Sequence, residues 1–95
     1  MYARITPYKL KPGSREAATR IVHELKPRIM ALPGMQRFTN VLAADGSGYV
    51  VALTTEPEMT PEVQEKVKAL WGALGEHLEA IPAATSCEVI VDWST

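Results

Sequence analysis

Four segments of the chain carry the pattern of β-strands, whose side chains alternate between two faces. The first covers residues 2–10 and the second covers residues 35–43. Residues 49–54 are apolar without alternation, which predicts a strand that is buried on both faces. The last strand is expected over residues 86–93, where apolar side chains recur at every second position. An Asp-Gly pair between the second and third strands predicts a hairpin.

Two further segments have the spacing of apolar residues that is typical of amphipathic helices. The first lies between two Pro-Gly pairs at positions 12–13 and 33–34, and Ser14 is expected to cap it through its hydroxyl group. The second begins after the expected N-cap Thr60 and stops before Pro82. Its predicted apolar face consists of Val63, Val67, Leu70, Leu74, Leu78 and Ile81.

The order of these elements is β-α-β-β-α-β, within one domain that comprises residues 1–95. Right-handed crossovers then give a ferredoxin-like α+β fold, in which a four-stranded antiparallel sheet carries both helices on one face. Two helices cannot cover both faces of this sheet, although the third strand is predicted to be buried on both. A second copy of the chain is the simplest cover, so we expect a homodimer that forms through the open sheet face.

Short motifs in the first half of the chain resemble a known group of proteins. They are the start Met1-Tyr2-Ala3-Arg4-Ile5-Thr6, the turn Lys11-Pro12-Gly13, and Pro27 followed six residues later by Pro33-Gly34. Together with the element order, these motifs resemble the dimeric α/β-barrel superfamily and, within it, the antibiotic-biosynthesis-monooxygenase-like (ABM-like) group. The resemblance implies a homodimer whose two sheets close into a barrel, with a small apolar cavity between the sheet and the helices of each subunit.

This resemblance leaves two kinds of function open. Members of the superfamily include cofactor-independent oxygenases of polyketide-like aromatics, haem-degrading enzymes and quinone oxidases. Active members often carry a tryptophan after the third strand, where this chain has Thr-Thr-Glu-Pro-Glu-Met at residues 54–59. The chain could be a cofactor-independent monooxygenase that acts on a small aromatic or quinol substrate. Alternatively, it could be a non-enzymatic homodimer that binds a small apolar or aromatic ligand or takes part in a stress response.

Composition and charge narrow the range of partners. Ten basic and eleven acidic residues give a net charge of −1, which lacks the basic field of a nucleic-acid-binding protein or a membrane-surface protein. No segment approaches the roughly 18 apolar residues of a membrane span. Cys87 is the one cysteine, so an intramolecular disulfide is impossible. No basic and then apolar leader precedes the first strand, and we therefore expect a cytoplasmic protein.

Few residues could carry chemistry. The sequence has no clustered metal ligands, no phosphate-binding glycine loop and no flavin or nicotinamide motif, so we expect neither a metal nor a cofactor. Arg4, Thr6 and Tyr8 share one face of the first strand, and the resemblance implies that this face looks toward the helices. They could orient a carbonyl or phenolate ligand in a mostly apolar pocket, or they could simply pack their stems at the sheet edge.

His77, Trp71 and Asn40 complete the set of candidate residues. His77 lies at the edge of the apolar face of the second helix, where it is either a structural residue or a general base, because histidine exchanges protons near neutral pH. Trp71 flanks the same face and could stack on a substrate or pack in the core. Asn40 on the second strand could reach a ligand or face solvent. His23 is expected on the far side of the first helix, without a role.

Overall fold

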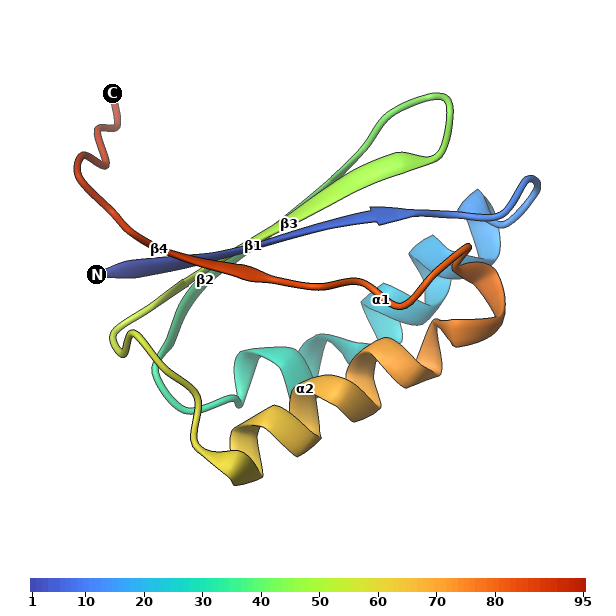
Figure 1. Ribbon diagram of the computed structural model, residues 1–95. Helices are drawn as coiled ribbons and strands as arrows, with labels where there is room; N and C mark the ends of the chain where they lie inside the picture. Colours follow the sequence, from blue (N-terminus) through green and yellow to red (C-terminus); the bar gives the residue numbers. More distant parts are fainter.

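A computed structural model of the protein describes residues 1–95 and contains one four-stranded sheet in the order β2-β3-β1-β4. All strand pairs are antiparallel, and both helices lie on the same face of the sheet (Figure 1). This arrangement confirms the predicted ferredoxin-like α+β fold. The elements are β1 (Tyr2–Lys9), α1 (Arg15–Met30), β2 (Met35–Leu42), β3 (Ser47–Thr54), α2 (Pro61–Ala73), the single 3-10 turn η1 (Gly75–His77) and β4 (Thr85–Glu88).

The start of α1 differs from the sequence-based expectation. Ser14 does precede the helix, but its side chain makes no capping hydrogen bond. Its hydroxyl oxygen lies 3.1 Å from Nδ1 of His77, and the residue is buried. Ser14 therefore joins the first helix to η1 instead of satisfying a free amide of its own helix, and the predicted capping role is wrong.

The start of α2 confirms the prediction, whereas its end does not. The side chain of Thr60 accepts a hydrogen bond of 3.3 Å from the amide of Val63. The helix ends at Ala73, since a tight turn through Gly75 follows it. Leu78 is then extended and pairs with Leu10 as an isolated bridge, so residues beyond it no longer belong to a helical face. Neither helix has the length and apolar composition that crossing a membrane requires.

The last strand is shorter than predicted. β4 pairs with β1 only over Thr85–Glu88, and the amide of Val89 makes one more bond, of 3.1 Å, to the carbonyl of Met1. β1 begins at Tyr2, which is paired with Glu88, so the alternating residues that follow in the last segment have no partner strand. Ile90 and Trp93 are each 89% exposed. The predicted strand over residues 86–93 is therefore wrong in its extent, because a strand is as long as its pairing allows.

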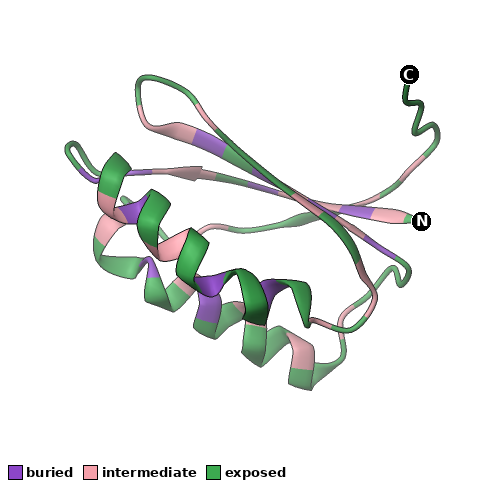
Figure 2. Cartoon of the chain, turned by 180° about the vertical axis from the view of Figure 1, so that it is seen from behind, coloured by how far each residue is buried: buried purple, intermediate pink, exposed green.

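The apolar core lies between the helices and one face of the sheet. Leu10, Ala18, Leu74 and Leu78 form one buried cluster, and Leu25, Ile29 and Leu70 form a second. Buried positions on the helices face the sheet (Figure 2). On β3, Val50 and Ala52 are buried while Tyr49 is 52% exposed, so burial of this strand on both faces is wrong for the single chain.

Candidate functional site

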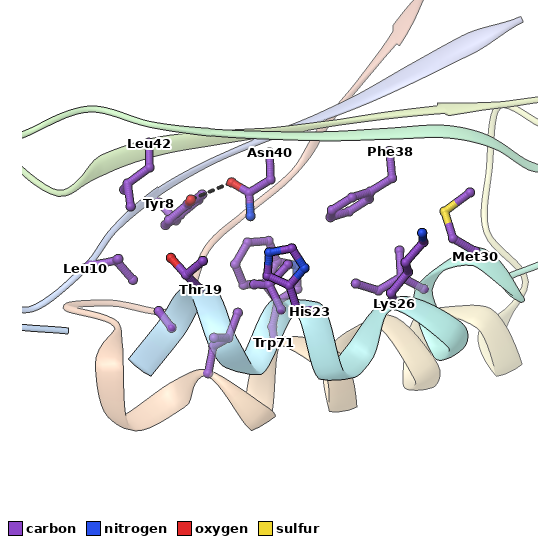
Figure 3. Close-up of a pocket in the computed structure, with 14 residues that line it drawn as sticks. Tyr8, Leu10, Thr19, His23, Lys26, Met30, Phe38, Asn40, Leu42 and Trp71 are labelled. Atoms are coloured by element: carbon purple, nitrogen blue, oxygen red, sulfur yellow. Dashed lines mark hydrogen bonds between the residues drawn. The ribbon is translucent and has the colours of Figure 1, made fainter. Parts of the chain in front are cut away.

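A cavity of about 320 Å³ lies between α1 and the sheet, where residues of β2 and β1 line it together with Trp71 of α2. Its volume lies within the range of about 300–1,000 Å³ that is typical of small-molecule sites. Most of the lining is apolar and comes from α1, β2, β1 and α2 (Figure 3). The principal apolar lining residues are Leu10, Val22, Ile29, Phe38, Leu42, Trp71 and Leu74.

Three of the predicted site residues meet in this cavity, although they come from three different elements. The Tyr8 hydroxyl on β1 donates a hydrogen bond of 2.6 Å to Oδ1 of Asn40 on β2. The ring centroids of Tyr8 and Trp71, which is on α2, are 5.7 Å apart and the rings are tilted by 55°. Because Oδ1 of Asn40 is taken by Tyr8, the amide nitrogen of Asn40 points toward the cavity (Figure 3). Asn40 can therefore donate a hydrogen bond to a ligand.

Burial shapes the chemistry of Tyr8. Loss of solvent raises the pKa of its phenol above the ordinary range, while the hydrogen bond with Asn40 and the positive charge of Arg15 oppose part of that rise. Tyr8 consequently stays protonated at neutral pH and acts as a hydrogen-bond donor. In this state its function is to hold the Asn40 amide in one orientation.

The position of the Tyr8 ring depends on the absence of a side chain at Gly48. These two residues are opposite one another in the β1–β3 pairing. A Cβ atom placed on Gly48 would lie 2.6 Å from Cε1 of Tyr8, closer than real contacts of a Cβ allow. The ring therefore lies directly over the glycine backbone, and Gly48 is a positioning residue for the pair Tyr8–Asn40.

The substitution Gly48→Ala should displace the Tyr8 ring and break its bond to Asn40. We expect a loss of about 1–3 kcal/mol in the free energy of unfolding, which is typical of an overpacked site. Urea denaturation measures this loss, and a crystal structure or the Asn40 amide resonances report the broken bond. Gly72→Ala is the matched control, because a Cβ there meets nothing within 4 Å and lies in a helix. An unchanged Asn40 environment in Gly48→Ala would contradict the positioning role.

A row of α1 side chains that the sequence analysis left without a role forms the outer wall. Thr19, His23, Lys26 and Met30 all line the cavity (Figure 3). The expectation that His23 lies on the far side of the helix is wrong. These positions follow one another at intervals of four, three and four residues, directly beside the apolar row Ala18, Val22, Leu25 and Ile29. That spacing was the signal in the sequence that could have identified them.

Arg4 and Thr6 line a neighbouring cavity of about 80 Å³. This smaller cavity shares Phe38, Asn40 and Trp71 with the larger one. Partial burial lowers the pKa of the Arg4 guanidinium. Arg4 takes part in neither of the ion pairs of the chain. Both residues therefore face the helices, as the resemblance implied, but they do not border the larger space beside Tyr8.

His77 is placed apart from the other predicted residues. Its Nδ1 lies 3.1 Å from the Ser14 hydroxyl, and its Nε2 lies 3.3 Å from Oε1 of Glu76. Its carbonyl also accepts a bond of 2.8 Å from the amide of Lys11. The side chain does not line either cavity described above. Through these contacts, His77 ties η1 to the start of α1.

The side chains of the cavity are suited to acid–base and hydrogen-bond chemistry on a small apolar ligand. His, Cys, Asp and Glu residues form no group of three or more that could hold a metal ion. The polar groups that reach the larger cavity belong to Tyr8, Asn40, Thr19, His23 and Lys26. They comprise hydrogen-bond donors, one group that can exchange a proton, and one cation.

Comparison with known proteins finds similarity in structure but not in sequence. No known protein family matches the sequence, and no curated protein matches it. A candidate antibiotic biosynthesis monooxygenase from Bordetella bronchiseptica superposes with a TM-score of 0.76 at 14% identity, over 95% of this chain and 97% of that one. A candidate antibiotic biosynthesis monooxygenase from Nitrosomonas europaea gives a TM-score of 0.72 at 14% identity, over 96% and 100%.

A third solved structure, of a protein of unknown function from Nitrosomonas europaea, gives a TM-score of 0.74 at 14% identity, over 99% of this chain and 93% of that one. At identities this low, the likeness concerns the fold and not the activity. It extends over nearly the whole length of this chain and of each of the three structures.

Proposed function

From the ABM-like fold of this chain, we propose that it is a cofactor-independent monooxygenase that acts on a small aromatic or quinol substrate. The observation that supports this proposal best is the arrangement of Asn40, Tyr8 and His23 around one mostly apolar cavity. A phenol placed there would have a hydrogen-bond donor on the sheet side and a proton acceptor on the helix side. These are the groups that activation of such a substrate requires.

The proposed reaction begins with removal of the phenolic proton by the imidazole of His23. The amide of Asn40, held in place by Tyr8, donates a hydrogen bond to the resulting oxyanion. An electron-rich anion of this kind transfers one electron to dioxygen, and the resulting radical pair combines to form a carbon–peroxide bond. The O–O bond then breaks as the same carbon loses its hydrogen, so that this carbon is oxidised to a ketone. The second oxygen atom leaves as water with that hydrogen and the proton that His23 removed, and the substrate supplies all four electrons. The apolar walls exclude solvent, which strengthens the hydrogen bond to the oxyanion.

A non-enzymatic function is the second candidate, and two placements favour it. Arg4 lies outside the larger cavity, and His23 is exposed at its rim instead of being buried beside the ligand. A homodimeric protein that only binds a small aromatic compound, or that acts in a stress response, needs no buried base. The two functions differ in one observable property, which is the consumption of dioxygen.

Oxygen uptake decides between these functions. Purified protein is incubated with a panel of anthrones and quinols in an oxygen electrode cell, without added cofactor and with a chelator present. The proposed monooxygenase consumes oxygen above the rate of the heat-denatured protein with at least one compound. If several compounds bind and none is consumed, the protein is a binding protein and the proposed activity is wrong.

We also propose a homodimer that forms through the open face of the sheet. Strand register places Tyr49, Val51 and Leu53 of β3 on that face, beside Ile5 of β1 and Val41 of β2. Tyr49 and Val41 are about half exposed, at 52% and 51%. A row of apolar residues across three strands is typical of a surface that another protein covers.

A charge at the centre of this face should separate the two subunits. Wild-type protein is expected to sediment as a dimer at micromolar concentration, and Val51→Glu as a folded monomer, because the new carboxylate would be buried without a partner. Ala69→Glu is the control, since residue 69 is exposed on α2, away from the open face. A wild-type protein that sediments as a monomer would rule out this assembly.

A further inference from the structure

The larger cavity is lined by basic side chains but by no acidic ones. Besides Tyr8, the ionisable side chains that line it are His23 and Lys26, and no aspartate or glutamate reaches it. The helix that carries both has four Lys or Arg residues and two Glu residues, hence a charge of 4 − 2 = +2. The whole chain has a net charge of −1, so the rest of the molecule carries −1 − 2 = −3.

The ammonium group of Lys26 has no partner within the chain. The ion pairs of the protein join Lys9 to Asp45 and His77 to Glu76, and the side chain of Lys26 makes no hydrogen bond. Figure 3 shows its Nζ reaching from α1 toward the sheet, at the end of the cavity where Phe38 and Met30 lie. The cation therefore stands at the mouth of an apolar space, where a bound ligand would meet it.

Lys26 and His23 are three residues apart on α1, which places them as neighbours on one side of the helix. Arg4 does not share this position. It borders the smaller cavity and also a third one, which Glu56 and Glu58 line, and it does not border the larger cavity. The uncompensated positive charge is consequently concentrated at the rim formed by α1.

We propose that the ligand of this cavity is an aromatic acid, with its rings among Phe38, Trp71 and Leu42 and its carboxylate at the rim beside Lys26. This inference rests on the proposed function, which places an aromatic substrate in this cavity. What it adds is that the substrate carries a negative charge. An aromatic carboxylate satisfies both parts of the site, since its rings replace water on the apolar walls and its anion pairs with the free ammonium group.

A matched pair of probes tests this inference. Anthracene carboxylate and anthracene methanol have the same ring system and differ in charge, and both can be titrated by their fluorescence. Wild-type protein should bind the carboxylate, and added sodium chloride should weaken that binding without affecting the neutral alcohol. The substitution Lys26→Gln should weaken carboxylate binding by about two- to fivefold, as expected for a partly exposed ion pair, and leave alcohol binding unchanged.

Lys68→Gln is the control for net charge, because Lys68 is an exposed residue of α2 that does not line the cavity. It should change the affinity for neither probe. Equal weakening of both probes in Lys26→Gln, or no binding of the carboxylate to the wild-type protein, would overturn the inference. The proposed oxygenation would remain standing in either case if the protein consumed oxygen with a neutral quinol, so the two tests fail separately.

Discussion

Replacing His23 by alanine is expected to lower the rate of oxygen uptake by about 100-fold or more, which is the usual contribution of a general base. The reason is that His23 is the residue on the larger cavity that can accept a proton from a bound phenol, while Tyr8 is held in its protonated state by burial. The initial rate with a responsive anthrone or quinol measures the effect. Binding of the substrate should change little, so the loss should appear in kcat and not in KM.

His77→Ala provides the comparison, because His77 was the candidate base in the sequence, with a structural role as the alternative. Its ring contacts Ser14 and Glu76 and does not line the cavity, so this variant should retain its rate and lose only stability. A large loss of rate in folded His77→Ala, with an unchanged rate in His23→Ala, would reverse the assignment. Equal rates in all three proteins would show that neither histidine is the base.

Leu74→Ala should be the most destabilising single substitution of those proposed, with a loss of about 2–5 kcal/mol in the free energy of unfolding. Leu74 is 8% exposed and packs with Leu10, Ala18 and Leu78 where α2 meets β1. It also borders the larger cavity, so its removal would merge the new void with the existing space. The expected loss therefore comes from the contacts of the Leu74 side chain with its buried neighbours.

Ile81→Ala is the control for this substitution, because the sequence pattern placed Ile81 on the same helical face as Leu74. In the structure, Ile81 is 94% exposed beyond the end of the helix, so its truncation should change stability by no more than about 0.5 kcal/mol. Urea midpoints at one fixed protein concentration measure both variants, since a dimer would make stability depend on concentration. Similar losses for the two variants would contradict this packing.

The sequence predicted the fold well because its signals are local. Alternation, helical spacing and the turn residues identify all six main elements, and the capping bond of Thr60 is present as expected. The errors concern properties that depend on distant partners. The length of β4 depends on where β1 begins, and the hydroxyl of Ser14 is used by His77, which is far away in the sequence. Local patterns contain no information about such contacts.

The site was predictable to the extent that strand faces are predictable. Alternation placed Tyr8 on one face with Arg4 and Thr6, whereas Asn40 was left to reach a ligand or to face solvent. Their hydrogen bond requires the β2-β3-β1 order of the sheet. His23 and Lys26 were missed because only the apolar row of α1 was taken as its inner face. When a helix borders a cavity, a wider part of its circumference faces inward than when it packs in a core. Polar residues beside the apolar row can then line the cavity.

The place of β1 at the centre of the sheet has a consequence for how the chain folds. β1 pairs with β3 at residues 47–54 and with β4 at residues 85–88, so none of its partners is adjacent in sequence. Contacts this distant require long loops to close, which slows folding. The β2–β3 hairpin has its partners nearby, and we expect it to form first. During synthesis, β1 would then remain an unpaired segment until most of the protein has emerged.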